Sequence, residues 1–140
     1  MSCLLICEKR IRYGGVLRAI HFINENKRVE NQVAALKAKD IDAFFGLVNE
    51  SGNSSYKYLE NVYSVKDVQN QNVSLALAIS EEVLGGDGVC RVHGGGFAGT
   101  IQSFVKNEAV AEYQKVMDLI FGEGSCSVLK IRKYGGMKVM

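Results

Sequence analysis

The spacing of apolar residues predicts a long helix near the start of the chain. Over residues 16–38, apolar side chains recur at steps of three and four residues, which places them on one helix face. We expect this face to be buried. It carries Ala19, Phe22, Ile23, Asn26, Val29, Val33 and Leu36.

A second helix is expected directly after Asp40, whose side chain suits an N-cap. Gly52 offers a left-handed stop for this helix. One of its faces carries Ile41, Phe44, Phe45 and Val48. The two helices together predict a helical hairpin.

The middle of the chain is less regular. Residues 53–70 are polar, contain three tyrosines and show no clear period, so we expect an ordered loop or a broken helix. Residues 72–84 are apolar on most sides and predict a covered helix that ends at Gly85 and Gly86.

Strand-like residues dominate the last third. Residues 89–93 and 100–105 predict two strands, followed by a helix capped by Asn107 and closed by Gly122. Alternating side chains over residues 125–132 predict a last strand.

This order of elements predicts the α+β class. We expect a ferredoxin-like two-layer sandwich, with a mostly antiparallel sheet and the helices on one side. Residues 16–140 are assigned to one domain. Residues 1–15 remain unassigned, with a possible short strand at residues 3–7.

Charge and composition exclude several functional classes. The formal net charge of the 140 residues is only +2, and basic residues are not interleaved with aromatic ones, so nucleic-acid binding is not expected. No apolar run approaches the length of a membrane span, and no secretory signal is visible. We therefore expect a cytoplasmic protein without membrane contact.

The four cysteines and two histidines show no metal-binding spacing. Cys3, Cys7, Cys90 and Cys126 form no Cys-x-x-Cys pair, which argues against a zinc site. We expect no metal ligands, and reduced thiols of which Cys90 and Cys126 are buried.

A glycine-rich stretch lies between the two predicted strands. Residues 92–100 read Val-His-Gly-Gly-Gly-Phe-Ala-Gly-Thr. Successive backbone N–H groups without side-chain cover can form an anion site. A bulged β-hairpin turn that uses glycine only for positive φ is the alternative. The stretch lacks the lysine of a P-loop, and a strand follows it where a dinucleotide fingerprint has a helix.

Residues 88–100, Gly-Val-Cys-Arg-Val-His-Gly-Gly-Gly-Phe-Ala-Gly-Thr, resemble the third signature motif of the GHMP kinases in its galactokinase form. Residues 19–29 are similar to a galactokinase helix with a Glu-Asn-x-Arg-Val-like run. Further matches follow in family order. Leu36, Asp40, Phe44 and Phe45 match a short helix of the family, and residues 49–55 and Tyr63-Ser64 match the segment after it. The resemblance extends from Arg18 to Gly136 and indicates the C-terminal domain of a galactokinase.

Three positions depart from the family pattern. The family more often has glycine at Ala98, cysteine at Thr100 and histidine at Gly52. None of these changes removes the glycine turn.

The resemblance implies a role beside ATP. In the family, the third motif helps to fix the triphosphate of ATP, and Mg²⁺ accompanies the nucleotide. The ATP-side residues implied here are Gly94, Gly95, Gly96, Phe97, Ala98 and Gly99. The sequence leaves two roles for Phe97, a core anchor or a ligand contact. It also leaves two roles for His93, a hydrogen-bonded structural residue or a phosphate contact.

The sugar motif, the phosphate loop and the catalytic Asp of the family belong to an N-terminal domain, and none of them is found here. No catalytic residue is therefore assigned, no cofactor is expected to bind this chain tightly, and no turnover is expected from it alone. The implied partner is the missing N-terminal kinase domain or a second copy of the chain. The alternatives are a stand-alone ferredoxin-like ligand-binding or regulatory module, and the product of a truncated gene.

Overall fold

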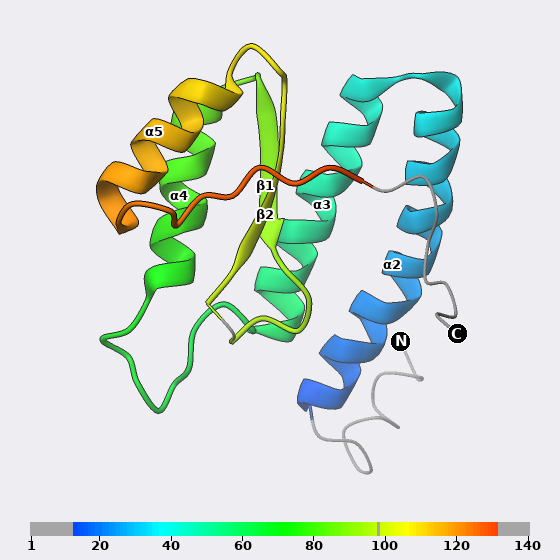
Figure 1. Ribbon diagram of the computed structural model, residues 1–140. Helices are drawn as coiled ribbons and strands as arrows, with labels where there is room; N and C mark the ends of the chain where they lie inside the picture. Colours follow the sequence, from blue (N-terminus) through cyan, green and yellow to red (C-terminus); the bar gives the residue numbers. More distant parts are fainter. Residues whose placement is uncertain (1–12, 98, 132–140) are drawn as a thin grey trace, which may run out of the picture.

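The computed structural model describes residues 13–97 and 99–131 (Figure 1). Four helices and two strands follow one another in the described chain. They are α2 (Tyr13–Ala38), α3 (Ile41–Leu59), α4 (Asn72–Leu84), β1 (Gly88–Val92), β2 (Ile101–Val105) and α5 (Val110–Phe121). The α+β class is confirmed. The possible strand at residues 3–7 lies outside the described residues, whereas residues 13–15 open α2.

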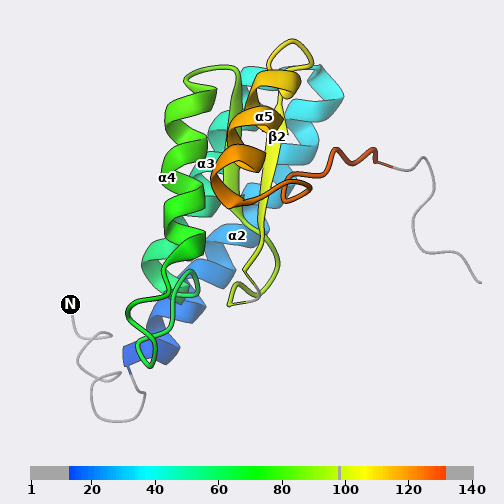
Figure 2. The ribbon, with the colours of Figure 1, turned by 60° about the vertical axis from the view of Figure 1, so that its left-hand side comes forward.

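The two strands form an antiparallel hairpin, with Gly88 opposite Val105 and Val92 opposite Ile101. Val89 and Phe104 pack against the cluster of α2 and α3, whereas Cys90 and Val92 pack against α4 and the loop before it. Because successive side chains of a strand point to opposite faces, the helices contact both faces of this hairpin. The predicted ferredoxin-like sandwich has its helices on one side of the sheet. Figure 1 shows the hairpin between α2–α3 and α4–α5, and in the turned view of Figure 2 both α3 and α4 lie to the left of β2.

Three small apolar clusters make up the core. One joins Val62, Val73 and Leu77 to β1, one joins Ala35, Phe44 and Val48 between α2 and α3, and one lies between α4 and α5. The last cluster contains Leu84, Tyr113 and Met117. Each helix pair is therefore attached to the hairpin through its own cluster.

The long helix α2 turns a different face inward from the one that the sequence predicts. The predicted buried face lies outward, with Phe22 67% exposed and Leu36 49% exposed. The side facing α3 carries His21, Glu25, Arg28, Gln32 and Ala35, of which the first four are only partly exposed and Ala35 is buried. These polar side chains face inward because α3 and β1 supply partners for most of them, as described below.

Two predicted helix boundaries are wrong, and three are confirmed. Helix α3 runs through Gly52 and ends at Leu59. A Cβ atom at residue 52 would lie 3.1 Å from the Cβ of Arg91, so this glycine allows close packing on β1. Asn107 does not cap α5, which begins at Val110 without a side-chain cap. Asp40 caps α3 by accepting a hydrogen bond from the Ala43 N–H (2.9 Å), and Gly85 and Gly122 end α4 and α5.

The last predicted strand is also wrong over its described part. Residues 125–131 form no strand, and Leu129 and Ile131 are 88% and 92% exposed. Hydrogen bonds join only the start of this segment to α5. The Cys126 N–H donates to Asp118 Oδ1, and Gln114 Nε2 donates to the Cys126 carbonyl oxygen. An alternating segment becomes a strand only when it pairs with another strand and one face is covered. Residues 127–131 pair with no strand of the described chain and are exposed. Separately, no described helix is long and apolar enough to cross a membrane.

Candidate functional site

The glycine-rich stretch forms the turn that joins β1 to β2. The His93 N–H donates to the Thr100 carbonyl oxygen at 3.1 Å and closes the base of the turn. Within it, Gly94, Gly96 and Gly99 have φ values of 59°, 72° and 79°. Three glycines are therefore needed for the backbone path itself, as in the hairpin interpretation.

Asn61 holds the turn from the side. Its carbonyl oxygen accepts a hydrogen bond from the Phe97 N–H at 3.0 Å. A Cβ atom on Gly96 would lie 2.0 Å from this same oxygen, so the loop after α3 and the turn are in direct backbone contact. The side chain of Asn61 is buried and accepts a hydrogen bond from the Ser55 hydroxyl at 3.1 Å. Its Nδ2 group has no partner among the described residues.

Two N–H groups of the turn remain available. Those of Gly94 and Gly95 donate no backbone hydrogen bond within the described residues, and both glycines are exposed. The N–H groups of Gly96 and Phe97 bond to His93 and Asn61. The turn can thus offer a short row of donors to an acceptor such as a phosphate oxygen.

Phe97 is not a core anchor. It is 66% exposed and has a φ of 51°, a backbone conformation that bulky residues rarely adopt. Of the two roles left open by the sequence, burial in the core is therefore excluded, and the ring lies at the exposed tip. Ala98 lies outside the described residues.

Next to the turn, β1 contributes Arg91 to a polar cluster that we define as Glu25, Arg28, Ser51 and Arg91. Arg91 Nη1 lies 3.4 Å from Glu25 Oε1 and also donates to Ser51 Oγ. Arg28 and Ser51 both donate to Glu25, and Arg28 Nε lies 3.5 Å from a carboxylate oxygen of Glu50. Arg91 thus forms a salt bridge with Glu25, and the cluster joins α2, α3 and β1.

The cluster changes the acidity of Glu25. Burial alone would raise the pKa of this carboxyl, but the Ser51 hydroxyl and the charges of Arg28 and Arg91 outweigh burial and hold the pKa below its usual value. Glu25 therefore stays ionised at neutral pH. One turn earlier on α2, His21 Nδ1 lies 3.0 Å from Ser54 Oγ on α3.

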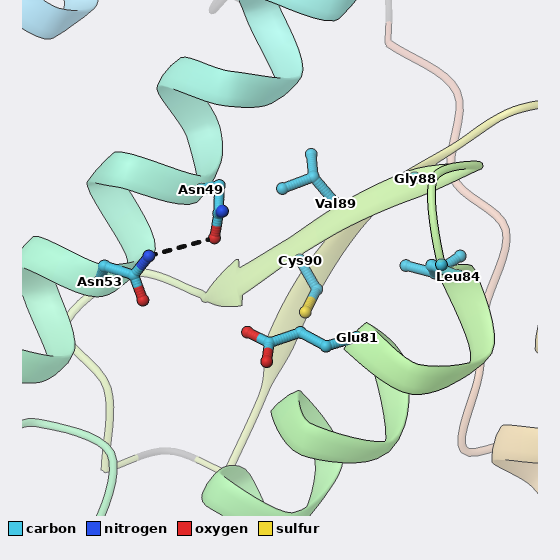
Figure 3. A pocket seen from close by; sticks show the side chains of 8 residues that line it. Asn49, Asn53, Glu81, Leu84, Gly88, Val89 and Cys90 are labelled. Carbon is cyan, nitrogen blue, oxygen red and sulfur yellow. Dashed lines mark hydrogen bonds between the residues drawn. The ribbon is translucent and has the colours of Figure 1, made fainter.

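Two hollows open between α3 and α4, at the unpaired edge of β1. One, of about 300 Å³, is lined by residues that include Asn49, Asn53, Glu81 and Cys90 (Figure 3). The other, of about 340 Å³, shares those four residues and adds Tyr56 and Ser74 among others. Neither hollow is lined by residues of the glycine turn, so the turn is an open surface feature in the described chain.

Sequence reasoning missed the two features that position the turn, which are Asn61 and the polar cluster. The cluster has a sequence signal, because His21, Glu25, Arg28 and Gln32 recur at helical steps beside the apolar stripe. Asn61 has none, since it lies in the irregular stretch after α3. In the described part of the chain, no three His, Cys, Asp or Glu side chains gather in a way that could hold a metal ion.

Similar proteins were found among galactokinases. The galactokinase of Glaesserella parasuis is 33% identical over 100 residues, which cover 71% of this chain and 24% of that protein. The galactokinase of Mannheimia succiniciproducens is 30% identical over 100 residues, with the same coverage. That of Staphylococcus carnosus is 32% identical over 104 residues, or 74% of this chain and 25% of that protein.

These matches are partial. The chain spans about a quarter of the length of the curated relatives that it matches, and the match is of C-terminal type. No family model and no solved structure matches the chain. The resemblance to the C-terminal part of galactokinases is thereby confirmed.

Proposed function

Over about 100 residues this chain is a relative of the galactokinases, and from that premise we propose that it supplies one wall of the ATP site of a galactokinase-like sugar kinase. The complete enzyme would transfer the γ-phosphate of ATP to O1 of galactose. The contribution of this chain is the third-motif turn beside the nucleotide phosphates.

The observation that carries the proposal is the geometry of the turn. Gly94 and Gly95 expose N–H groups without backbone partners among the described residues, and the Asn61 carbonyl group contacts the adjoining Gly96 and Phe97. Fixed N–H donors stabilise phosphate oxygens without reorganising when the ligand arrives. We assign Gly94, Gly95, Gly96, Phe97 and Gly99, together with Ala98, to this wall.

The chemistry of phosphoryl transfer needs more than this wall. Cations must neutralise the transferred phosphate while the acceptor hydroxyl is held in line with it. Mg²⁺ supplies part of this neutralisation when it is bound with ATP. The described residues place no acidic cluster at the turn. We therefore infer that the catalytic base and the metal ligands come from an N-terminal kinase domain.

The alternative of a stand-alone ligand-binding module has one observation in its favour. The hollow of about 340 Å³ between α3 and α4 is lined by polar side chains, including Asn49, Asn53 and Glu81. A module of this kind would be stabilised by its ligand when alone. A rise in the melting temperature with galactose or Mg-ATP would favour it, whereas the kinase-wall proposal expects no shift.

The direct test is a fusion. This chain would replace the matching C-terminal segment of the Glaesserella parasuis galactokinase, and galactose phosphorylation would be measured. We expect the fusion to be active and its Gly96→Val variant to lose activity at least about 100-fold. Its Gly86→Ala variant, which lies outside the turn with open space around it, should keep activity. A folded fusion that remained fully active with Gly96→Val would refute the role of the turn.

A further inference from the structure

The outward face of α2 has the spacing of a helix-pairing seam. Its steps alternate between three and four residues, the heptad spacing by which one helix packs on another. All six positions are exposed in the structure. They are Ala19, Phe22, Asn26, Val29, Val33 and Leu36.

The polar cluster fixes this orientation. Glu25 and Arg28 are held by Ser51 and Arg91 on the inward side of α2, so the helix cannot rotate to bury the seam without breaking those contacts. Figure 1 shows α2 at the outer edge of the molecule, with α3 between it and the hairpin. These inner contacts therefore keep the seam on the outer side of α2.

The seam is narrow, which indicates that its occupant is another helix. A helix packed on a globular core carries an apolar stripe more than about 100° wide, whereas a two-residue-per-heptad stripe is typical of helix pairs. We propose that the occupant is α2 of a second copy of this chain, and that the two helices pair antiparallel about a two-fold axis.

The side chains of the seam are complementary to themselves in this arrangement. With Asn26 opposite Val29 of the second copy, Phe22 lies opposite its Val33 and Ala19 lies opposite its Leu36. Phe22 and Leu36 thus face the smaller Val33 and Ala19, which favours interlocking without voids at these layers. A two-fold axis repeats each of these pairs, as an isologous interface requires.

A parallel pair would place each seam residue opposite its own copy. Phe22 would then face Phe22, and Ala19 would face Ala19 of the second copy, so large side chains meet large ones and small ones meet small ones. Packing therefore favours the antiparallel arrangement.

Asn26 does not prevent burial of the seam. Its Nδ2 group already donates to the Phe22 carbonyl oxygen at 3.0 Å, so only its side-chain oxygen would need a partner. A single polar residue in a seam costs some stability and favours one register over others.

The paired length indicates a weak dimer. The seam covers about 27 Å of helix at about 1.5 Å per residue. A stable interface buries about 800 Å² per partner, and one helix pair of this length lies at or below that value. Ile23, which flanks the seam and is 57% exposed, extends the contact. We therefore expect association in the micromolar range rather than at nanomolar concentration.

Sedimentation of the full chain over a range of concentrations tests the pairing. We expect a monomer–dimer equilibrium whose dissociation constant rises at least about tenfold with Phe22→Glu. Leu119→Glu is the matched control, because Leu119 is 82% exposed on α5 and outside the seam. It should leave the equilibrium unchanged. A monomer at all concentrations up to about 1 mM, or a dimer equally affected by both variants or by neither, would overturn the proposal.

Disulfide trapping tests the orientation. In a background with the four native cysteines replaced by serine, a mixture of Phe22→Cys and Val33→Cys chains should form a mixed cross-link. Leu36→Cys chains should cross-link to one another only in a parallel pair, because the two Leu36 positions lie at opposite ends of an antiparallel seam, and that result would contradict the antiparallel arrangement. The pairing does not rest on the proposed kinase role, so a monomeric chain would leave that role standing.

Discussion

The carbonyl oxygen of Asn61 lies 2.0 Å from the position that a Cβ atom would take on Gly96, and it accepts the Phe97 N–H at 3.0 Å. Residue 96 must therefore be glycine for this contact to exist, quite apart from its φ of 72°. The contact joins a loop that follows α3 to the turn between the strands, and it fixes the turn in the orientation described above.

A series of glycine-to-alanine changes separates the two constraints. Gly96→Ala should lower the free energy of unfolding by at least about 2 kcal/mol, since it adds both a clash and left-handed strain. A Cβ atom on residue 94 would meet open space, so Gly94→Ala adds only the left-handed strain and should lower the free energy of unfolding by about 1 kcal/mol. Gly95→Ala, with neither constraint, should change stability by less than about 0.5 kcal/mol. Urea unfolding followed by circular dichroism measures all three, and equal effects would contradict the Asn61 contact.

Removing the charge of Glu25 should loosen α2. Glu25→Gln leaves Arg28 and Arg91, both largely covered, without their carboxylate partner. We expect a loss of about 1–3 kcal/mol, below the value for fully buried pairs because the cluster is partly solvated. Glu30→Gln on the exposed side of the same helix is the control and should be nearly neutral. Urea unfolding at pH 7 compares the two variants.

The contribution of Glu25 to the free energy of unfolding should depend on pH. Its pKa in the folded chain is depressed, so the stabilisation is complete above the unfolded value of about 4.3 and is lost as the pH falls through the folded value. The difference in unfolding free energy between the wild type and Glu25→Gln should be constant from pH 6 to 8 and shrink below about pH 4. A difference that grew on acidification would contradict this sign.

The hydroxyl of Tyr113 joins α5 to α4 and to β2. It lies 2.7 Å from Ser80 Oγ and 2.8 Å from Ser103 Oγ in a buried site. Tyr113→Phe should cost about 1–2 kcal/mol, since two buried hydroxyl partners lose a hydrogen bond. Tyr56→Phe removes only an exposed contact with Ser74 and should cost less than about 0.5 kcal/mol. Equal melting temperatures for the two variants would show that the Tyr113 contacts carry no stability.

The buried thiol of Cys90 should be inert in the folded chain. Burial, and to a smaller extent the charge of Glu81, raises the pKa of Cys90 to about 11, so little thiolate forms at pH 8. Its contribution to stability is present below the unfolded value of about 8.5 and is lost as the pH rises towards 11. Treatment with a thiol reagent at pH 8, followed by peptide mapping, should modify Cys90 only after unfolding. Rapid labelling of Cys90 in the folded chain would contradict its burial.

The sequence predicted most of the helices and the hairpin because these elements carry local signals. Asp40 supplies an oxygen for the Ala43 N–H, and Gly85 and Gly122 end their helices, all of which depends on neighbours within a few residues. The strand predicted at 125–132 depends instead on a distant neighbour. Alternation there is real, but Leu129 and Ile131 are exposed, and their segment pairs with no strand of the described chain.

The orientation of α2 shows a second limit. Apolar periodicity identifies a face that tends to be covered, and it does not say by what. Here Glu25 and Arg28 find partners on α3 and β1, so the polar side packs inward and Phe22 faces outward. Only the three-dimensional positions of Ser51 and Arg91 show which face is turned inward.

For the candidate site, the sequence predicted the glycine turn and its family resemblance. It could not predict Asn61, because the contact joins residues 61 and 96 through the backbone and leaves no pattern along the chain. Nor could it decide the role of Phe97, whose exposure depends on the path of the turn.

Galactokinase turnover by the purified chain alone tests the central claim most directly. The claim is that this chain holds one wall of an ATP site whose catalytic groups lie on another domain. With galactose and Mg-ATP, we expect no galactose 1-phosphate above the enzyme-free blank, because one wall cannot hold both substrates in line. Turnover well above the blank, lost on removal of the chain, would contradict the account.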